Sequence, residues 1–381
     1  MGKNILIISG EESGDMHGAA LMGELREKIG DISFFGMGGA KMRSAGLEGL
    51  DYKEVSVVGL VEVLKKLGAI RSYLKKLKDV LHSEKIHCVV LIDFPDFNLR
   101  IAAEAKKLGI PIVYYISPQI WAWRKNRIKK IASLVDKMLV VFPFEEKLYR
   151  AEGVDVEFVG HPLADIAVCD KEKDEAKAEL GYKRTVSVVS ILPGSRVEEV
   201  TQLLKPMADG AVLAGEYSRW VVKFILHAAD SIDEELIESI LKDHPIKKKL
   251  QIIRGPKRYT ALRASDCAMI ASGTATLEAV LIGTPIGIVY KLSYISYIIG
   301  RFLLRIKYIG LPNILLGKPL VDEILQHKVT KANIAHEILR LLEAPMEVEH
   351  MMEGYKEIQD SLSRPGASKR AAEAISSIIG E

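Results

Sequence analysis

The chain has 381 residues, of which 53 are basic and 50 acidic, and its formal net charge is +3. This length predicts two domains, because a single hydrophobic core seldom extends beyond about 250–300 residues. The balanced charge gives no global case for binding nucleic acid, so we expect no nucleic-acid partner.

Short apolar runs alternate with amphipathic helical patterns along the first half of the chain. The runs include NILIIS (4–9), CVVLI (88–92), PIVYYIS (111–117) and KMLVV (137–141), and the first is followed by a predicted helix from about Asp15 to Ile29. Apolar runs of this kind between helices predict a parallel sheet whose two faces are both covered.

A charged stretch, residues 168–184, separates this half from a second series of strand and helix patterns. We therefore predict an α/β protein with domains at 1–165 and 166–345, with the C-terminal helices, about 346–381, left open to pack back on the first domain. Interfaces between such domains commonly bind ligands, and here the domains are expected to meet near Pro162 to Lys173.

Cysteine usage and hydropathy indicate a cytoplasmic location. Cys88, Cys169 and Cys267 are far apart and form no CxxC pair, which is typical of thiols in a reducing compartment. The most apolar long segment, residues 294–310, is interrupted by basic residues, so it lacks the roughly 18 uninterrupted apolar residues of a spanning helix. We expect a protein that is soluble or lies on a membrane surface.

The loop GEESGDMH (10–17) places Glu11, Glu12 and Asp15 directly after the first predicted strand. Loops at the carboxyl ends of parallel strands form the rim where α/β proteins bind ligands. The alternative is a solvated loop in which Ser13 or Asp15 caps the following helix.

Two further motifs, DFPDFN (93–98) and ISPQIWAWR (116–124), also follow strands and are expected to converge on the same rim. They would bring together Asp93, Asp96, Asn98 and two tryptophans. Asp96 could equally cap a helix, and Trp121 and Trp123 could serve packing alone.

The second half has two strand-to-helix turns suited to a nucleotide. In LPGSR (192–196), Ser195 and Arg196 combine a hydroxyl and a guanidinium with the N–H groups of a helix start, which suits a phosphate. In SGTATLEA (272–279), Glu278 lies one helical turn beyond Thr274, where a carboxylate would reach ribose hydroxyls. The alternatives are a helix cap with a surface arginine and an exposed helical glutamate.

Neither half contains GxGxxG or GxxxxGK[ST], so an NAD-linked oxidoreductase is only a minor alternative. The histidines lack the spacing of metal ligands, and no DxD pair stands beside the phosphate turns. We therefore expect no essential metal and no cofactor.

Seven motifs in order resemble the lipid-A-disaccharide synthase family over essentially the whole chain: SGEESGDMHGA, DFPDFN, SPQIWAWR, GHPLAD, LPGSR, SGTATLEA and GLPNILL. The resemblance implies a GT-B glycosyltransferase, with two Rossmann-like, doubly wound parallel-sheet domains facing a central cleft. His17 departs from the expected pattern and is given no role beyond a polar contact.

The resemblance also implies the reaction. 2,3-Diacylglucosamine would pass from UDP to the 6-hydroxyl of 2,3-diacylglucosamine 1-phosphate (lipid X), with inversion, giving a β(1→6) disaccharide and UDP. Other GT-B possibilities are a UDP-GlcNAc 2-epimerase and a lipid II glucosaminyltransferase, and a non-enzymatic nucleotide-sugar-binding protein is a further alternative.

Site roles follow from this resemblance. Asp96 would be the base, and Asp93 and Asn98 would orient it. Glu11, Glu12 and Asp15 would bind acceptor hydroxyls or support the base, and an acid of this 11–15 loop is the alternative base. The donor residues are expected to stabilise the leaving UDP, hold its ribose or lie near the diphosphate or sugar; they are Ser195, Arg196, Ser272, Gly273, Thr274, Glu278 and Asn313.

The segment 55–81 contains more apolar residues than the buried face of one helix requires, and lysines lie near them. These apolar residues are Val57, Val58, Leu60, Val61, Leu64 and Leu67. We expect this group and the apolar segment 294–310 to form a basic-rimmed patch at the cleft mouth, which rests on the anionic inner membrane of a Gram-negative cell from the cytoplasmic side and admits acyl chains. The alternative is an ordinary core helix. The sequence leaves the oligomeric state open, a homodimer included.

Overall fold

A computed structural model describes residues 2–55, 67–118, 127–291, 307–362 and 364–380. The chain forms two compact units. The first contains Met1–Asp165 and Leu362–Glu381, and the second contains Ile166–Leu292 and Ile306–Ser361. The last helix of the chain therefore belongs to the first unit.

The first unit is built on a parallel sheet of seven strands in the order β3-β2-β1-β4-β5-β6-β7. The central strands are buried because helices cover both faces, which explains their continuous apolar runs. The strands are β1 (Lys3–Ser9), β2 (Ile32–Gly38), β3 (Leu47–Asp51), β4 (Cys88–Ile92), β5 (Ile112–Tyr115), β6 (Lys137–Val140) and β7 (Val156–Phe158).

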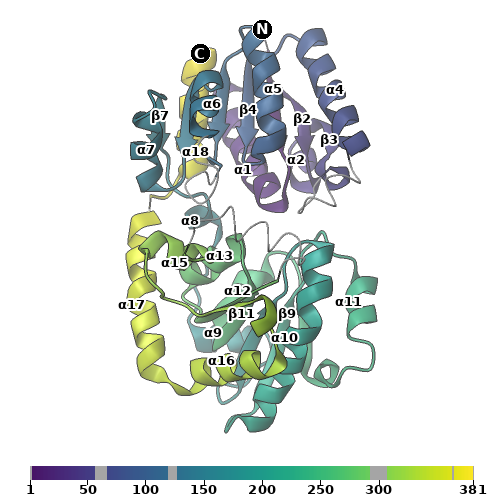
Figure 1. Cartoon of the computed structure of the whole chain (residues 1–381), viewed down its shortest axis with the longest axis vertical. Helices are drawn as coiled ribbons and strands as arrows, with labels where there is room; N and C mark the ends of the chain where they lie inside the picture. Colours follow the sequence, from purple (N-terminus) through teal and green to yellow (C-terminus); the bar gives the residue numbers. More distant parts are fainter. Residues whose placement is uncertain (1, 56–66, 119–126, 292–306, 363, 381) are drawn as a thin grey trace. The chain divides into compact units, whose positions relative to one another are not determined.

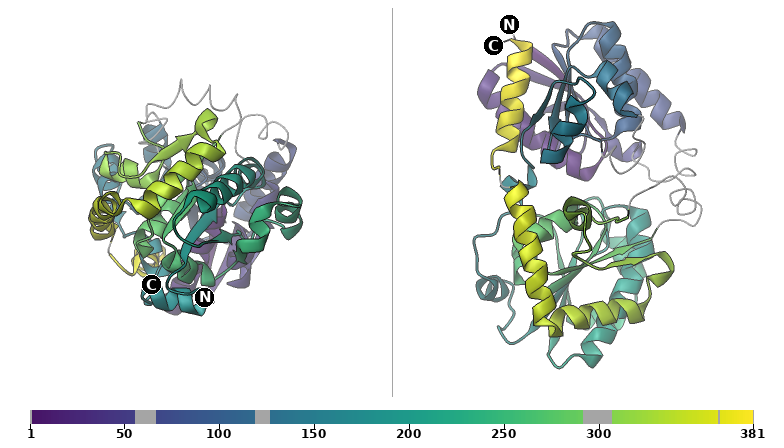
Figure 2. Two further views of the ribbon diagram at one scale, coloured as in Figure 1. Left: turned by 90° about the horizontal axis from the view of Figure 1, so that it is seen from below. Right: turned by 60° about the vertical axis from the view of Figure 1, so that its left-hand side comes forward.

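Two groups of helices cover this sheet (Figure 1). One face carries α4 (Leu67–Ser83), α5 (Pro95–Lys107) and α6 (Arg127–Leu134). The other carries α1 (Glu12–Ile29), α2 (Ala40–Ser44) and the C-terminal α18 (Ala367–Ile379), and α18 packs along α1 (Figure 2). Shorter elements complete the connections: η1 (Tyr52–Glu54), α7 (Pro143–Arg150) and α8 (Leu163–Ile166).

The second unit contains a parallel sheet of six strands in the order β10-β9-β8-β11-β12-β13. Its strands are β8 (Ser187–Leu192), β9 (Val222–His227), β10 (Leu250–Ile253), β11 (Cys267–Ala271), β12 (Ile286–Tyr290) and β13 (Glu323–Leu325). Its helices are α9 (Lys173–Glu179), α10 (Val197–Tyr217), α11 (Glu234–Ile240), η2 (Pro245–Lys249), α12 (Lys257–Ala264), α13 (Thr274–Ile282), α15 (Leu311–Leu316), η3 (Gln326–Lys328), α16 (Lys331–Glu343) and α17 (Pro345–Leu362).

Both sheets have the Rossmann strand order, which confirms the predicted class of two doubly wound α/β domains. In this order the chain direction across the sheet reverses between two central strands, which are β1 and β4 in the first unit and β8 and β11 in the second. We call the segments that directly follow these four strands the switch-point turns. Ligands of open α/β sheets bind at this position.

Helix α1 begins at Glu12, three residues before the expected start. Glu11 is the N-cap, and Glu12 and Asp15 lie in the first turn, where acidic side chains interact favourably with the helix dipole. The acids of the opening loop are therefore part of a helix start.

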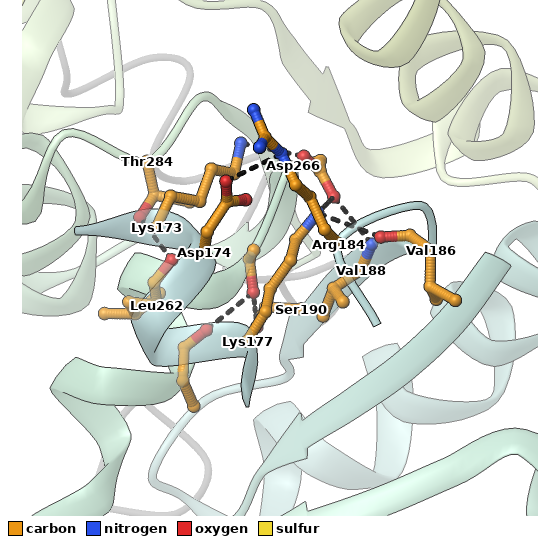
Figure 3. Close-up of polar contacts among 12 residues, drawn as sticks. Lys173, Asp174, Lys177, Arg184, Val186, Val188, Ser190, Leu262, Asp266 and Thr284 are labelled. Carbon is orange, nitrogen blue, oxygen red and sulfur yellow. Dashed lines mark hydrogen bonds and ion pairs between the residues drawn. The ribbon is translucent and has the colours of Figure 1, made fainter. Parts of the chain in front are cut away.

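A partly buried ion cluster lies where the strands of the second sheet begin, away from its switch-point turns (Figure 3). Asp266 Oδ2 accepts hydrogen bonds from Val188 N and Lys177 Nζ, both at 2.8 Å, and Oδ1 pairs with Lys173 Nζ at 2.8 Å. Burial raises the pKa of Asp266, but the two lysines outweigh it and hold the pKa below its ordinary value. The cluster joins α9, within the charged 168–184 stretch, to β8 and β11.

Candidate active site

The first switch-point turn of the first unit contains Asp15, which is 3% exposed. Its carboxylate accepts three backbone hydrogen bonds from the start of α2: Gly39 N at 2.7 Å, Met42 N at 3.0 Å and Lys41 N at 3.0 Å. Helix starts leave such N–H groups without partners in the helix, and an acid satisfies them well. Asp15 thus ties α1 to α2.

The second switch-point turn has an unusual backbone. Asp93 and Phe94 have φ of 41° and 46°, the left-handed region that residues other than glycine rarely adopt. Two buried side chains hold this turn, because the Tyr114 hydroxyl and the Asn98 amide both donate to the carbonyl of Asp93. Strained backbone that the surrounding structure holds in place is characteristic of functional sites.

The two turns are in contact. A Cβ atom added to Gly10 would lie 2.3 Å from Cγ of Phe94, so only glycine permits this approach. The structure thereby brings the GEESGD and DFPDFN motifs together, as expected from the strand order.

The third motif begins beside the second. Ile116 has φ of 61°, and its carbonyl accepts a hydrogen bond from Asp93 N at 3.3 Å. Ser117 Oγ donates to the fully buried carboxylate of Glu145 at 2.5 Å. The rest of the motif, with Trp121 and Trp123, lies in 119–126, outside the described residues.

Asp96 stands in the first turn of α5 with 67% of its side chain exposed, and it forms an ion pair with Arg127 at the start of α6. Arg127 is only 15% exposed. Sequence reasoning missed this arginine, although the basic run RKNRIKK after the tryptophans was a signal for it.

His17 contacts a second histidine, His161 of the GHPLAD motif, with ring centroids 6.2 Å apart. His161 Nδ1 accepts a hydrogen bond from Leu163 N at 3.1 Å. Burial, reinforced by His17, lowers the pKa of His161 to about 3, so this imidazole is neutral at physiological pH. The GHPLAD motif thus lies beside α1.

In the second unit, the turn after β8 is organised by Glu199, which sequence reasoning did not single out. Its carboxylate accepts from Ser195 N at 3.2 Å and from Arg196 Nη1 at 2.9 Å. Gly194 has φ of 115°, and a Cβ there would lie 2.3 Å from Glu199 Oε2. Glu199 therefore fixes the orientation of both predicted phosphate ligands.

The turn after β11 contains Ser272, whose hydroxyl donates to the carbonyl of Ile309 at 3.2 Å. Gly273 is the N-cap of α13, and Thr274 is its first residue. One turn further, Glu278 has only 8% of its side chain exposed and pairs with Arg258 at 2.7 Å. The predicted ribose ligand is thus an almost buried carboxylate with a cationic neighbour.

Asn313 is 1% exposed, and its amide makes four hydrogen bonds. Nδ2 donates to Val321 O at 2.8 Å and Glu323 Oε1 at 2.9 Å, and Oδ1 accepts from Leu320 N at 2.7 Å and Val321 N at 2.9 Å. Two donors and two accepting lone pairs are the full capacity of the side chain. This arrangement holds α15 against the segment before β13.

Most of the predicted membrane residues lie outside the described residues; they are Val57, Val58, Leu60, Val61 and Leu64. Leu67 is described, is half-buried and begins α4. The apolar segment 294–310 is described only from Lys307 onward. Of the helices in the described ranges, none has both the length and the apolar character that crossing a bilayer requires.

Within the described part of the chain, no three or more His, Cys, Asp or Glu residues are grouped so as to hold a metal ion. Cationic and hydroxyl side chains at or near the switch-point turns of the second unit include Arg196, Arg258, Ser195, Ser272 and Thr274.

Two Rossmann-like units whose polar motifs follow the switch-point strands form the GT-B type of fold. Two solved structures share this fold. UDP-GlcNAc 2-epimerase from Neisseria meningitidis, bound to UDP-GlcNAc, has a TM-score of 0.66 at 15% identity and covers 98% of this chain and 99% of its own. A glycosyltransferase from Rickettsia africae has a TM-score of 0.54 at 11% identity and covers 100% and 99%. At these identities the likeness concerns the fold alone.

Sequence comparison identifies the family. Residues 5–378 match the family described as lipid-A-disaccharide synthetase. The lipid-A-disaccharide synthase of Syntrophus aciditrophicus is 44% identical over 372 residues, covering 97% of this chain and 96% of the relative. The chain belongs to the lipid-A-disaccharide synthetase family, and it is a glycosyltransferase of lipid A biosynthesis that uses a nucleotide-sugar substrate.

Proposed function

We propose that the chain transfers 2,3-diacylglucosamine from its UDP derivative to the 6-hydroxyl of 2,3-diacylglucosamine 1-phosphate, forming the β(1→6) disaccharide 1-phosphate and UDP. Family membership over residues 5–378 is the observation that carries this proposal. The first unit would bind the acceptor and the second unit the UDP-sugar.

In the first unit, the base would be Asp96, whose exposed carboxylate takes the proton of the acceptor hydroxyl as that oxygen attacks the anomeric carbon. A single in-line displacement breaks the bond to UDP and inverts the centre. Asn98 would position this base by fixing the Asp93 turn, which is supported by its hydrogen bond to the Asp93 carbonyl at 2.7 Å. Arg127 would orient the carboxylate through their ion pair.

The acids of the opening loop would have different tasks. Asp15 would position α1 and α2, because its carboxylate accepts three backbone N–H groups. Glu11, half-buried at the N-cap of α1, stays a candidate for binding acceptor hydroxyls.

In the second unit, negative charge develops on the departing diphosphate and must be stabilised. Arg196 and Ser195 would do this from the start of α10, oriented by Glu199. The turn formed by Ser272, Gly273 and Thr274 would add the N–H groups at the start of α13. Glu278 would hold the ribose, and Asn313 would act by positioning α15.

The acyl chains of both substrates require contact with an apolar surface. We propose that the apolar group of segment 55–81, defined above, rests on the anionic inner leaflet. The described part of α4 supports this with exposed basic residues, Arg71, Lys75 and Lys76. Changing Val58, Leu60 and Leu64 together to serine should release the protein from anionic vesicles and raise KM for the lipid substrates. Unfolding of this variant, or unchanged vesicle binding, would show that the segment is core.

The test of the reaction is incubation with UDP-2,3-diacylglucosamine and 2,3-diacylglucosamine 1-phosphate, followed by mass spectrometry of the lipid products. We expect a disaccharide 1-phosphate whose formation requires both substrates, with one UDP released per disaccharide. Conversion of the UDP-sugar to an epimer without acceptor would contradict the transferase.

A further inference from the structure

The carboxylate of Glu278 has a specific cationic partner. Arg258 Nη2, from the start of α12, donates to Glu278 Oε1 at 2.7 Å. The Glu278 side chain is 8% exposed and that of Arg258 is 30% exposed. An almost buried carboxylate loses much of its hydration, and a cation at hydrogen-bond distance compensates for that loss.

Arg258 is itself held in place. Its guanidinium lies 4.7 Å from the centroid of the Tyr259 ring and donates to the Tyr259 hydroxyl at 2.6 Å. Contact with an aromatic face and a hydrogen bond together restrict an otherwise flexible side chain. The pair therefore has one defined geometry.

Arg258 also has a histidine neighbour that contributes no positive charge. His227, at the end of β9, is buried, and its Nε2 lies 2.8 Å from Ser190 Oγ. Burial, with Arg258 nearby, lowers the pKa of His227 to about 3, so the imidazole is neutral. Of these neighbours, Arg258 alone brings positive charge to Glu278.

We propose that Arg258 is a positioning residue for the donor nucleoside: it holds the Glu278 carboxylate in one orientation, so that this carboxylate accepts hydrogen bonds from the ribose hydroxyls. The inference rests on the proposed donor role of Glu278. When an acceptor group is already held in place before the ligand binds, binding loses less entropy in ordering that group. Arg258 acts through Glu278, so its effect depends on the ribose hydroxyls.

The same helix provides a matched control. Arg263 of α12 also has 30% of its side chain exposed and pairs with a carboxylate, Glu172 Oε2, at 3.2 Å. Glu172 is 81% exposed and is the N-cap of α9 within the second unit, so this pair does not belong to a switch-point turn. The variant Arg263→Gln therefore measures the general effect of removing an arginine from α12.

The experiment measures, by calorimetry, the affinity of the full chain for UDP and for 2′,3′-dideoxy-UDP, which lacks both ribose hydroxyls. Because hydrogen bonds to a charged group are strong, we expect the wild type to bind UDP about tenfold or more tightly than 2′,3′-dideoxy-UDP. Arg258→Gln should reduce this preference to within about threefold, and Arg258→Lys, which keeps the charge without the planar fork, should retain part of it. Arg263→Gln should bind both nucleotides as the wild type does.

Glu278→Gln separates the two levels of the inference. If Glu278→Gln keeps the full preference for UDP, the proposed ribose role of Glu278 is wrong. If Glu278→Gln loses it but Arg258→Gln keeps it, even with weaker binding of both nucleotides, Arg258 is not a positioning residue. Should Arg258→Gln fail to fold, Arg258→Lys decides alone: a preference equal to that of the wild type overturns the inference.

Discussion

The switch-point turns of the two units occupy the same place in the same topology but differ in chemistry and backbone. In the first unit they carry acids, and Asp93, Phe94 and the nearby Ile116 have positive φ although none is glycine. In the second unit they carry hydroxyls and arginine, and the positive φ at the turn after β8 belongs to Gly194.

This difference reflects what each turn must provide. A glycine turn lets a ligand approach the backbone closely, and the helix start that follows it offers N–H groups to an anion. A turn with side chains in the left-handed region costs about 1–3 kcal/mol per residue but fixes the direction of those side chains. The Tyr114 and Asn98 hydrogen bonds to the Asp93 carbonyl help to offset that cost. The comparison supports the proposed division of tasks, with proton transfer in the first unit and anion binding in the second.

The largest expected effect is that of Asp96→Asn. Removing the base should lower kcat by on the order of 10² or more, the usual scale for general-base catalysis, while UDP affinity stays unchanged. Initial rates of disaccharide formation and calorimetry with UDP measure the two quantities.

Glu11→Gln is the comparison in the same unit, since it removes an acid charge at the N-cap of α1 and leaves Asp96 in place. A larger loss of kcat in Glu11→Gln than in Asp96→Asn would move the base to the opening loop. Near-normal turnover of Asp96→Asn would show that Asp96 is not the base and would contradict the proposed division of tasks between the units.

We expect Asp15→Asn to affect the stability of the protein more than its catalytic rate. The amide has one accepting oxygen for three backbone N–H groups that now bind a charged carboxylate. We expect a loss of about 1–3 kcal/mol in the free energy of unfolding, the cost of buried polar groups left without partners. Urea denaturation measures it, and a folded, equally stable variant with strongly reduced kcat would instead make Asp15 catalytic.

Arg196→Ala should weaken UDP binding by about tenfold, because a charge-assisted contact to the diphosphate is lost. Arg184→Ala is a suitable comparison, since Arg184 is also paired with an acid, Asp174, but precedes β8 at the opposite end of the strand. Equal UDP affinity in the two variants would remove Arg196 from the anion site.

The smallest expected effect is that of chelation. If arginine and helix starts stabilise the leaving diphosphate, excess EDTA should leave the rate of disaccharide formation unchanged. Loss of the reaction on chelation, with recovery on addition of Mg²⁺, would show that the second unit needs a metal to do its part.

Much of the fold and the location of the site followed from the sequence. Continuous apolar runs such as 4–9 and 88–92 predicted buried parallel strands, and the polar residues after them marked the rim. The start of α1 was placed three residues too late, because Glu11 and Glu12 looked like loop acids while the helix dipole favours acids in the first turn.

Sequence by itself determined which residues end each strand, because a run of buried side chains must stop where polar groups reach solvent. Only the tertiary structure decided what those residues contact. Asp15 meets α2 some 24–27 residues away, Asp96 meets Arg127 31 residues away, and Glu278 meets Arg258 20 residues away. Such partners are set by strand order and helix packing, which bring distant turns to one edge of a sheet, and local patterns do not encode them.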